Sequence, residues 1–120
     1  MAKVLVVDDT ESARTVLSRL LRSDGFETEM AADGAEAVKM VEESPPDLIV
    51  LDLHMPEMDG LAVLEWLRSR PRHGAVAVII LSAAGAEEMQ RAAALGAKAC
   101  LTKARATWPQ IQHEVHEHTP

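Results

Sequence analysis

Aromatic residues are nearly absent from this chain of 120 residues: they make up 2% of it, and there is no tyrosine. Its core must therefore be built from Leu, Val, Ile, Met and Ala. The one cysteine, Cys100, excludes an internal disulfide, and its simplest role is that of a small buried hydrophobe. No apolar run approaches the ~18 residues of a membrane span, and the first residues show no signal-peptide pattern. These absences favour a cytoplasmic protein.

Basic residues are also in short supply, with 12 Lys and Arg against 19 Asp and Glu and a net charge of −7. A protein that grips a nucleic-acid backbone needs a basic surface, so we expect no nucleic-acid partner for this chain. Hydrophobic residues make up 48% and charged residues 26%, which is typical of a folded globular protein. The length predicts a single domain over residues 1–120.

Strand-like and helix-like segments alternate five times along the chain. Short apolar or alternating runs predict strands at residues 3–7, 27–31, 48–51, 76–81 and 99–101. The segment at 27–31 alternates polar and apolar residues like an edge strand, and the wholly apolar 76–81 is typical of an interior one. The first helical segment places on one stripe Ala13, Val16, Leu17, Leu20 and Leu21. Five repeated βα units predict an α/β fold, a five-stranded parallel sheet with helices on both faces.

Polar side chains follow four of these strands directly. Asp8-Asp9 comes after the first strand, Asp52 after the third, Ser82 after the fourth and Lys103 just after the fifth. The carboxyl ends of parallel strands meet at one edge of a sheet, where ligands bind. We therefore expect three carboxylates, a hydroxyl and an ammonium group to converge on one pocket.

Three carboxylates so close together repel one another unless a cation neutralises them. Oxygen ligands with room for water suit Mg²⁺ or Mn²⁺ better than zinc. Helix capping by Asp9 or Thr10 is the competing explanation for the first acidic pair. A metal beside Ser82 and Lys103 would suit a phosphoryl group, because the metal, the ammonium and the hydroxyl can each take one phosphoryl oxygen.

These residues, together with the segment Asp52-Leu53-His54-Met55-Pro56-Glu57-Met58-Asp59-Gly60, resemble the receiver domain of two-component response regulators over nearly the whole chain. The resemblance implies the strand order 2-1-3-4-5. It implies that Asp52 accepts a phosphoryl group from a phosphohistidine on a histidine kinase or histidine phosphotransfer protein. Mg²⁺ would be held by Asp8, Asp9, Asp52 and the backbone carbonyl of His54, and the phosphoryl group would be recognised by Ser82 and Lys103.

The same resemblance implies a signalling switch that catalyses only its own phosphorylation and dephosphorylation. We expect a monomer or weak homodimer with a downstream effector that the sequence does not identify. Two positions depart from the family pattern: Cys100 replaces the usual aromatic residue three before the lysine, and Ala104 replaces the proline that commonly follows it. Both changes put the usual read-out surface in doubt, because Cys100 is too small to act as a large two-position side chain.

Other functions fit less well. An aspartyl-nucleophile phosphatase usually carries a second acid two residues after the nucleophile, where this chain has His54. A flavodoxin-type cofactor binder needs a Gly- or Ser/Thr-rich phosphate loop after the first strand, and this chain lacks one. A degenerate receiver that binds partners without phosphorylation stays open as an alternative. The histidines at 113, 116 and 118 lack metal-site spacing and predict a solvated helix face, and Trp66 and Trp108 predict packing.

Overall fold

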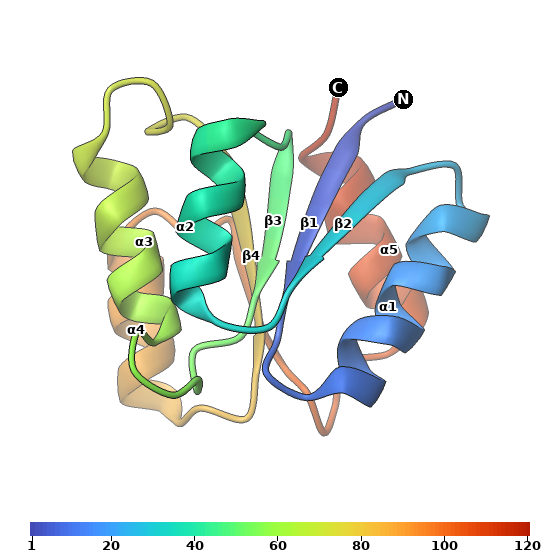
Figure 1. The fold of residues 1–120 in the computed structure, drawn as a ribbon. Coiled ribbons are helices and arrows are strands. Elements are labelled where there is room, and N and C mark those ends of the chain that lie inside the picture. Colours follow the sequence, from blue (N-terminus) through green and yellow to red (C-terminus); the bar gives the residue numbers. More distant parts are fainter.

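A computed structural model describes residues 1–120 and contains five strands and five helices that alternate from the N-terminus (Figure 1). The elements are β1 Lys3–Val7, α1 Glu11–Ser23, β2 Glu27–Ala31, α2 Gly34–Glu43, β3 Leu48–Leu51, α3 Gly60–Ser69, β4 Ala77–Ser82, α4 Ala86–Ala94, β5 Ala99–Thr102 and α5 Trp108–Glu117. The predicted alternation is confirmed. Two strands end one residue later than predicted, at Ser82 and Thr102.

All neighbouring strands pair in parallel in the order β2-β1-β3-β4-β5, as the resemblance implies. Strand β2, in which polar and apolar residues alternate, is an edge strand, and the apolar β4 is an interior one, as predicted. Val7 of β1 is in register with Leu51 of β3, which is in register with Ile80 of β4. The carboxyl ends of these three strands are therefore level with one another.

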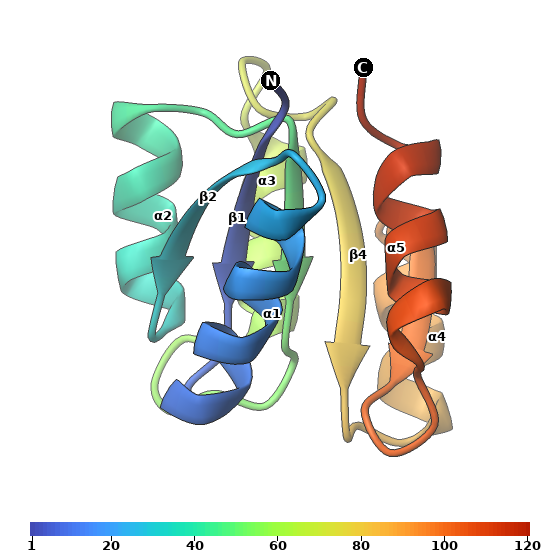
Figure 2. The same ribbon diagram turned by 90° about the vertical axis from the view of Figure 1, so that its right-hand side faces the viewer.

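The strands send alternate side chains to opposite faces of the sheet, and each face is covered by helices. Helices α2, α3 and α4 lie on one face and α1 and α5 on the other, as Figures 1 and 2 show. One apolar cluster joins Leu5, Ile49 and Ile80 to the first group of helices, and a second joins Val6 and Ile79 to α1 and α5. The predicted three-layer arrangement is confirmed.

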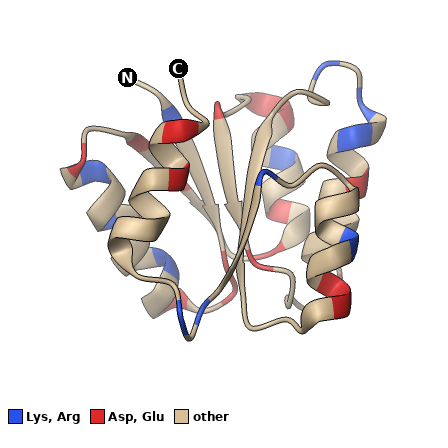
Figure 3. Ribbon diagram, turned by 180° about the vertical axis from the view of Figure 1, so that it is seen from behind, with Lys and Arg blue, Asp and Glu red and all other residues tan.

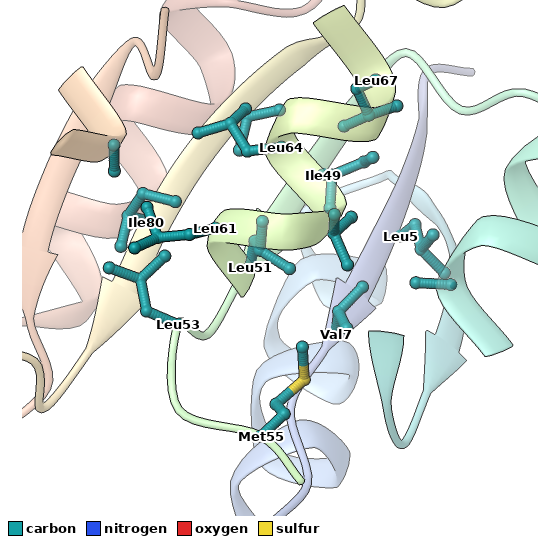
Figure 4. Packing of buried hydrophobic residues seen from close by; sticks show 14 of the residues in the cluster. Leu5, Val7, Ile49, Leu51, Leu53, Met55, Leu61, Leu64, Leu67 and Ile80 are labelled. Carbon is teal, nitrogen blue, oxygen red and sulfur yellow. The ribbon is translucent and has the colours of Figure 1, made fainter. Parts of the chain in front are cut away.

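The larger cluster also contains two residues of the loop between β3 and α3. Leu53 is 1% exposed and Met55 is 8% exposed, and both point into the cluster, Leu53 near Leu61 and Met55 near Val7 (Figure 4). Burying side chains of this size stabilises their position by roughly 1.5–3 kcal/mol each. The loop that follows Asp52 is thus anchored in the core on both sides of His54.

The stripe predicted on α1 is buried only in part. Leu17 and Leu21 are buried, whereas Val16 is 56% and Leu20 is 37% exposed. Five positions at helical spacing cover a wider arc than the sheet can reach, so the outer two face an apolar groove that Trp108 of α5 also lines. None of the five helices combines the length and the hydrophobicity that a membrane-spanning segment requires.

Arg68 near the end of α3 ties that helix to α4. Its guanidinium donates four hydrogen bonds, to the carbonyls of Leu95 and Gly96 after α4 and of Gly74 and Val76 before β4, at 2.8–3.2 Å. Burial lowers the pKa of Arg68, but the guanidinium stays charged and its donors match these carbonyls. This side chain therefore holds the C-terminal end of α4 in place.

Arg68→Ala should lower the free energy of unfolding by about 2 kcal/mol, because hydrogen bonds to a charged donor contribute roughly 1.5–3 kcal/mol and the freed carbonyls regain only part of this from water. The measurement is urea unfolding of both proteins. Arg72→Ala is the matched control, since Arg72 is exposed and makes no hydrogen bond or ion pair. Equal unfolding midpoints for the two variants would contradict the role assigned to Arg68.

Candidate functional site

The level carboxyl ends of the strands bring the predicted polar residues together. Acidic and basic segments meet at this lower edge of the sheet (Figure 3). Asp8, Asp52 and Ser82 are buried, being 6%, 5% and 0% exposed, while Asp9 is exposed. Lys103, the residue directly after β5, extends its side chain to the same place. All five side chains predicted to converge do so.

Asp52 accepts hydrogen bonds on both of its carboxylate oxygens. Its Oδ1 accepts from the Ser82 hydroxyl at 2.6 Å and from the backbone N–H of His54 at 3.0 Å. Its Oδ2 accepts from the Lys103 ammonium at 3.0 Å. A nearly buried carboxylate would be costly without partners, and these three supply them. Because they come from β4, from the loop after β3 and from the residue after β5, they hold the carboxylate in one orientation.

Lys103 bridges two buried acids. Its Nζ lies 2.6 Å from Asp8 Oδ2 and 3.0 Å from Asp52 Oδ2, and its side chain is 29% exposed. Burial alone would lower the pKa of this lysine, but the hydrogen bonds and charges of Asp8 and Asp52 together raise it above its usual value. Lys103 therefore stays protonated and offsets the repulsion between the two carboxylates.

The acidic pair after β1 does not cap α1. The N-cap of that helix is Thr10, whose side chain makes no capping hydrogen bond. Asp8 Oδ1 instead accepts from the backbone N–H of Thr10 at 2.9 Å, which turns its other oxygen toward Lys103. The alternative that the side chain of Asp9 or Thr10 caps this helix is therefore wrong.

The acid cluster fits a small divalent ion. One carboxylate oxygen from each of Asp8, Asp9 and Asp52 can be chosen so that all lie within 4.8 Å of one another. Two oxygens on opposite sides of a Mg²⁺ ion lie about 4.1 Å apart, given ~2.05 Å metal–oxygen distances. A small side-chain movement would therefore close the cluster around the ion. The donor set is oxygen only, which suits Mg²⁺ or Mn²⁺.

Ser82 connects the carboxylate to two loops. Its hydroxyl oxygen accepts from the backbone N–H of Leu53 at 3.3 Å and of Ala84 at 3.2 Å while the hydroxyl donates to Asp52. Its position at the end of β4 places it in register with Thr102, the residue before Lys103. Ser82 thus links the Asp52 carboxylate by hydrogen bonds to the loops after β3 and β4.

The first turn of α3 packs against the backbone of the site. Asp59 caps this helix by accepting from the N–H of Ala62 at 2.9 Å. Gly60 follows, and a Cβ atom there would lie 2.3 Å from the carbonyl oxygen of Asp52. Only glycine permits so close an approach, and Gly60 also donates its N–H to Leu53 at 3.0 Å. The Asp59-Gly60 pair thus fixes the return of the loop after Asp52.

His54 was predicted to contribute its backbone carbonyl, and that role stays a prediction. The structure adds a contact that sequence reasoning missed: ring atom Nε2 lies 2.9 Å from Oε1 of Glu88, in the first turn of α4. The hydrogen bond with Glu88 raises the pKa of His54, and nearby Asp52 and Asp59 add to this. Glu88 lies 34 positions along the chain in a helix with no site motif, so no sequence signal pointed to it.

The remaining predicted residues lie away from the acid cluster. Cys100 packs against the larger core cluster, and burial raises the pKa of its thiol. His116 pairs with Asp24 at 2.5 Å and lowers the pKa of that acid, so this part of the histidine-rich helix fastens α5 to the end of α1. Trp66 stacks on the buried ring of His73, with the ring centroids 5.6 Å apart.

Comparison with known proteins agrees with this geometry. The family model described as "Response regulator receiver domain" matches residues 4–113. A probable chemotaxis protein CheY of Rhizobium etli is 42% identical over 103 residues, which cover 84% of this chain and 80% of that protein. The transcriptional regulatory protein PrrA of Mycobacterium tuberculosis is 47% identical over 81 residues, which cover 68% of this chain.

Only 34% of PrrA is covered by this match, so the chain spans about a third of that relative. Among solved structures, the chemotaxis protein CheY4 of Vibrio cholerae superimposes with a TM-score of 0.89 at 31% identity and covers 98% of both chains. The fold is therefore shared with proteins of known class over almost the full length described.

Proposed function

The chain belongs to the response regulator receiver family, a family of signalling domains, and from that premise we propose that Asp52 is its phosphoacceptor. The donor is a phosphohistidine on a histidine kinase or histidine phosphotransfer protein. The single observation that supports this most strongly is the carboxylate of Asp52, nearly buried between the Ser82 hydroxyl and the Lys103 ammonium and beside two further acids.

The transfer is a displacement at phosphorus. A carboxylate oxygen of Asp52 forms a bond to phosphorus as the phosphorus–nitrogen bond of the donor breaks, and the imidazole nitrogen keeps that electron pair. The acceptor needs no proton removed, because Asp52 reacts as the carboxylate. Its fixed orientation lowers the entropy cost of reaching the in-line geometry.

Ser82 and Lys103 would then change partners. In the unphosphorylated protein both carboxylate oxygens of Asp52 accept hydrogen bonds, one from Ser82 and the other from Lys103. The oxygen that bonds to phosphorus ceases to be a charged acceptor. Whichever oxygen reacts, Ser82 or Lys103 loses an acceptor and gains phosphoryl oxygens next to it. Both groups donate, so each can bind one of those oxygens. This exchange is the switch that we infer.

Asp8, Asp9, Asp52 and the backbone carbonyl of His54 would hold Mg²⁺, with Mn²⁺ as a substitute. When bound, the ion would neutralise charge on the transferring oxygens. The orientation of Asp8 by Thr10 and the position of Asp9 at the open side of the cluster support this assignment.

We also infer that residues 1–120 act as one receiver unit in the cytoplasm, as a monomer or weak homodimer. Its chemistry is limited to its own phosphorylation and dephosphorylation, so it is not an enzyme acting on other substrates. We expect no direct nucleic-acid partner for this unit, because the net charge of −7 does not favour binding to nucleic acid.

The test is phosphorylation by a small phosphodonor such as phosphoramidate, followed by intact mass spectrometry. The parent should gain one phosphate with Mg²⁺ and almost none with EDTA, and Asp52→Asn should gain none because an amide cannot form the acyl phosphate. Asp47→Asn is the matched control, since Asp47 lies at the opposite end of the same strand and an amide oxygen can still accept from Lys3. Full labelling of Asp52→Asn would refute the assignment.

A further inference from the structure

One contact at the rim of the acid cluster has no part in the transfer described above. The ring of His54, in the loop after β3, meets the carboxylate of Glu88, in the first turn of α4, at 2.9 Å. The side chains are 53% and 41% exposed, so the pair spans open space between a loop and a helix. Glu88 is the one hydrogen-bond partner of the ring.

The pair forms part of the wall of a hollow of ≈ 390 Å³. The hollow is lined by Asp9, Leu53, His54, Met55, Asp59 and Glu88. Asp9 belongs both to this lining and to the acid cluster, so the hollow adjoins the reacting carboxylate. Leu53 and Met55 are fixed by the core, which leaves the exposed His54 ring as a part of the wall that can swing.

The chemistry that this wall would affect is loss of the phosphoryl group, and the argument here rests on the proposed function. In hydrolysis a water oxygen bonds to phosphorus as the phosphorus–oxygen bond to Asp52 breaks. Asp52 leaves as the carboxylate with the electron pair, and the proton of the water passes to the phosphate product. The water must approach from the side opposite Asp52. Asp52 is 5% exposed and does not line the hollow itself, but Leu53 and His54, which follow it, and Asp9 of the acid cluster do, so the hollow lies beside the carboxylate.

We propose that Glu88 is a positioning residue that holds the His54 ring at the rim of this hollow and so limits the approach of in-line water to the aspartyl phosphate. His54 is held at two points: its backbone N–H donates to Asp52 at 3.0 Å, and its ring contacts Glu88. Without Glu88 the backbone anchor remains, but the ring turns freely about its side-chain bonds. The path for water then opens for part of the time.

The test follows the decay of the aspartyl phosphate after the phosphodonor is removed by desalting, with intact mass spectrometry over time in Mg²⁺ buffer. Glu88→Ala should shorten the lifetime about two- to fivefold, the range expected when a solvent-exposed ion pair is lost. Glu87→Ala is the matched control, since this neighbour is exposed, equally charged and makes no such contact, and it should keep the parental lifetime.

Two further variants separate the contact from the charge. Glu88→Gln removes the same charge, but its amide oxygen can still accept from the ring, so the lifetime should stay near that of the parent. In a His54→Ala background, which keeps the backbone carbonyl, Glu88→Ala should have no additional effect. A simple loss of structure in α4 would move the lifetime in that background too.

The inference is overturned if Glu88→Ala decays at the parental rate or if Glu88→Gln decays as fast as Glu88→Ala. A parent that gains no phosphate at Asp52 refutes the proposed function and this inference with it. A phosphorylated parent whose lifetime is independent of Glu88 refutes the inference alone.

Discussion

Lys103→Met should destabilise the metal-free protein by about 3 kcal/mol at neutral pH. Its ammonium lies 2.6 Å from Asp8 and 3.0 Å from Asp52, and both acids are almost fully buried. Removing one partner from a buried ion pair costs roughly 3–5 kcal/mol, and the partial exposure of Lys103 places the expected loss at the lower end. Methionine has a similar shape, so packing is largely kept.

The contacts of Lys103 also predict a pH dependence. Hydrogen bonds and charges from Asp8 and Asp52 outweigh burial and raise the pKa of Lys103. A lysine with a raised folded-state pKa stabilises the fold fully below its unfolded value of about 10.4, and this contribution is lost as the pH rises through the folded value. The stability gap between parent and variant should therefore be constant from about pH 7 to 9 and shrink above about pH 10.5.

Urea unfolding with EDTA measures the gap, with Lys98→Met as the control because Lys98 is exposed and makes no ion pair. Millimolar Mg²⁺ should narrow the gap, since the ion would neutralise the same two carboxylates. If Lys103→Met and Lys98→Met unfold at the same urea concentration, the ammonium is not offsetting buried charge.

Gly60→Ala should cost about 3 kcal/mol and also impair phosphorylation. The added Cβ would lie 2.3 Å from the carbonyl oxygen of Asp52 and 2.7 Å from the Cα of Leu53, and both are backbone atoms that cannot rotate away. Overpacking of this kind typically costs 1–3 kcal/mol, and here the hydrogen bond from Gly60 to Leu53 is strained as well. The start of α3 must therefore shift away from the phosphoacceptor loop.

The control for Gly60→Ala is Gly85→Ala, at the N-cap of α4, where a Cβ would meet nothing within 4 Å. That variant should lose no more than about 1 kcal/mol, the usual cost of alanine at an N-cap. Thermal unfolding and phosphate labelling would be measured on both. Similar melting temperatures and equal labelling would show that the contact between α3 and Asp52 is not as tight as described.

The sheet and the residues at its edge could be predicted because four of the five strands are apolar runs followed by a polar residue. Asp52 and Asp8 are signalled in this way, and parallel strands bring such ends together. The capping hypothesis for Asp9 and Thr10 failed because a local pattern cannot show that Asp8 turns back to bind the Thr10 N–H. A capping acid can be distinguished from an acid of the site only by its contact with Lys103, which lies far along the chain.

Contacts without a residue-type pattern could not be predicted. Arg68 binds only backbone carbonyls, which every residue carries, so its acceptors leave no trace in the sequence. Glu88 reaches His54 from another element, and its position in the first turn of α4 looks like ordinary helix-dipole chemistry. The exposure of Val16 depends on how far α5 extends over α1, which periodicity does not encode.

The central claim is that Asp52 itself carries the phosphoryl group. The most direct measurement is reductive trapping: borohydride converts an aspartyl phosphate to homoserine, and peptide mass spectrometry then locates the changed residue. After treatment with phosphoramidate and Mg²⁺, homoserine should appear at position 52 and nowhere else, and EDTA should abolish it. Homoserine at Asp8 or Asp9, or none at position 52 in a protein that has gained phosphate, would contradict the account.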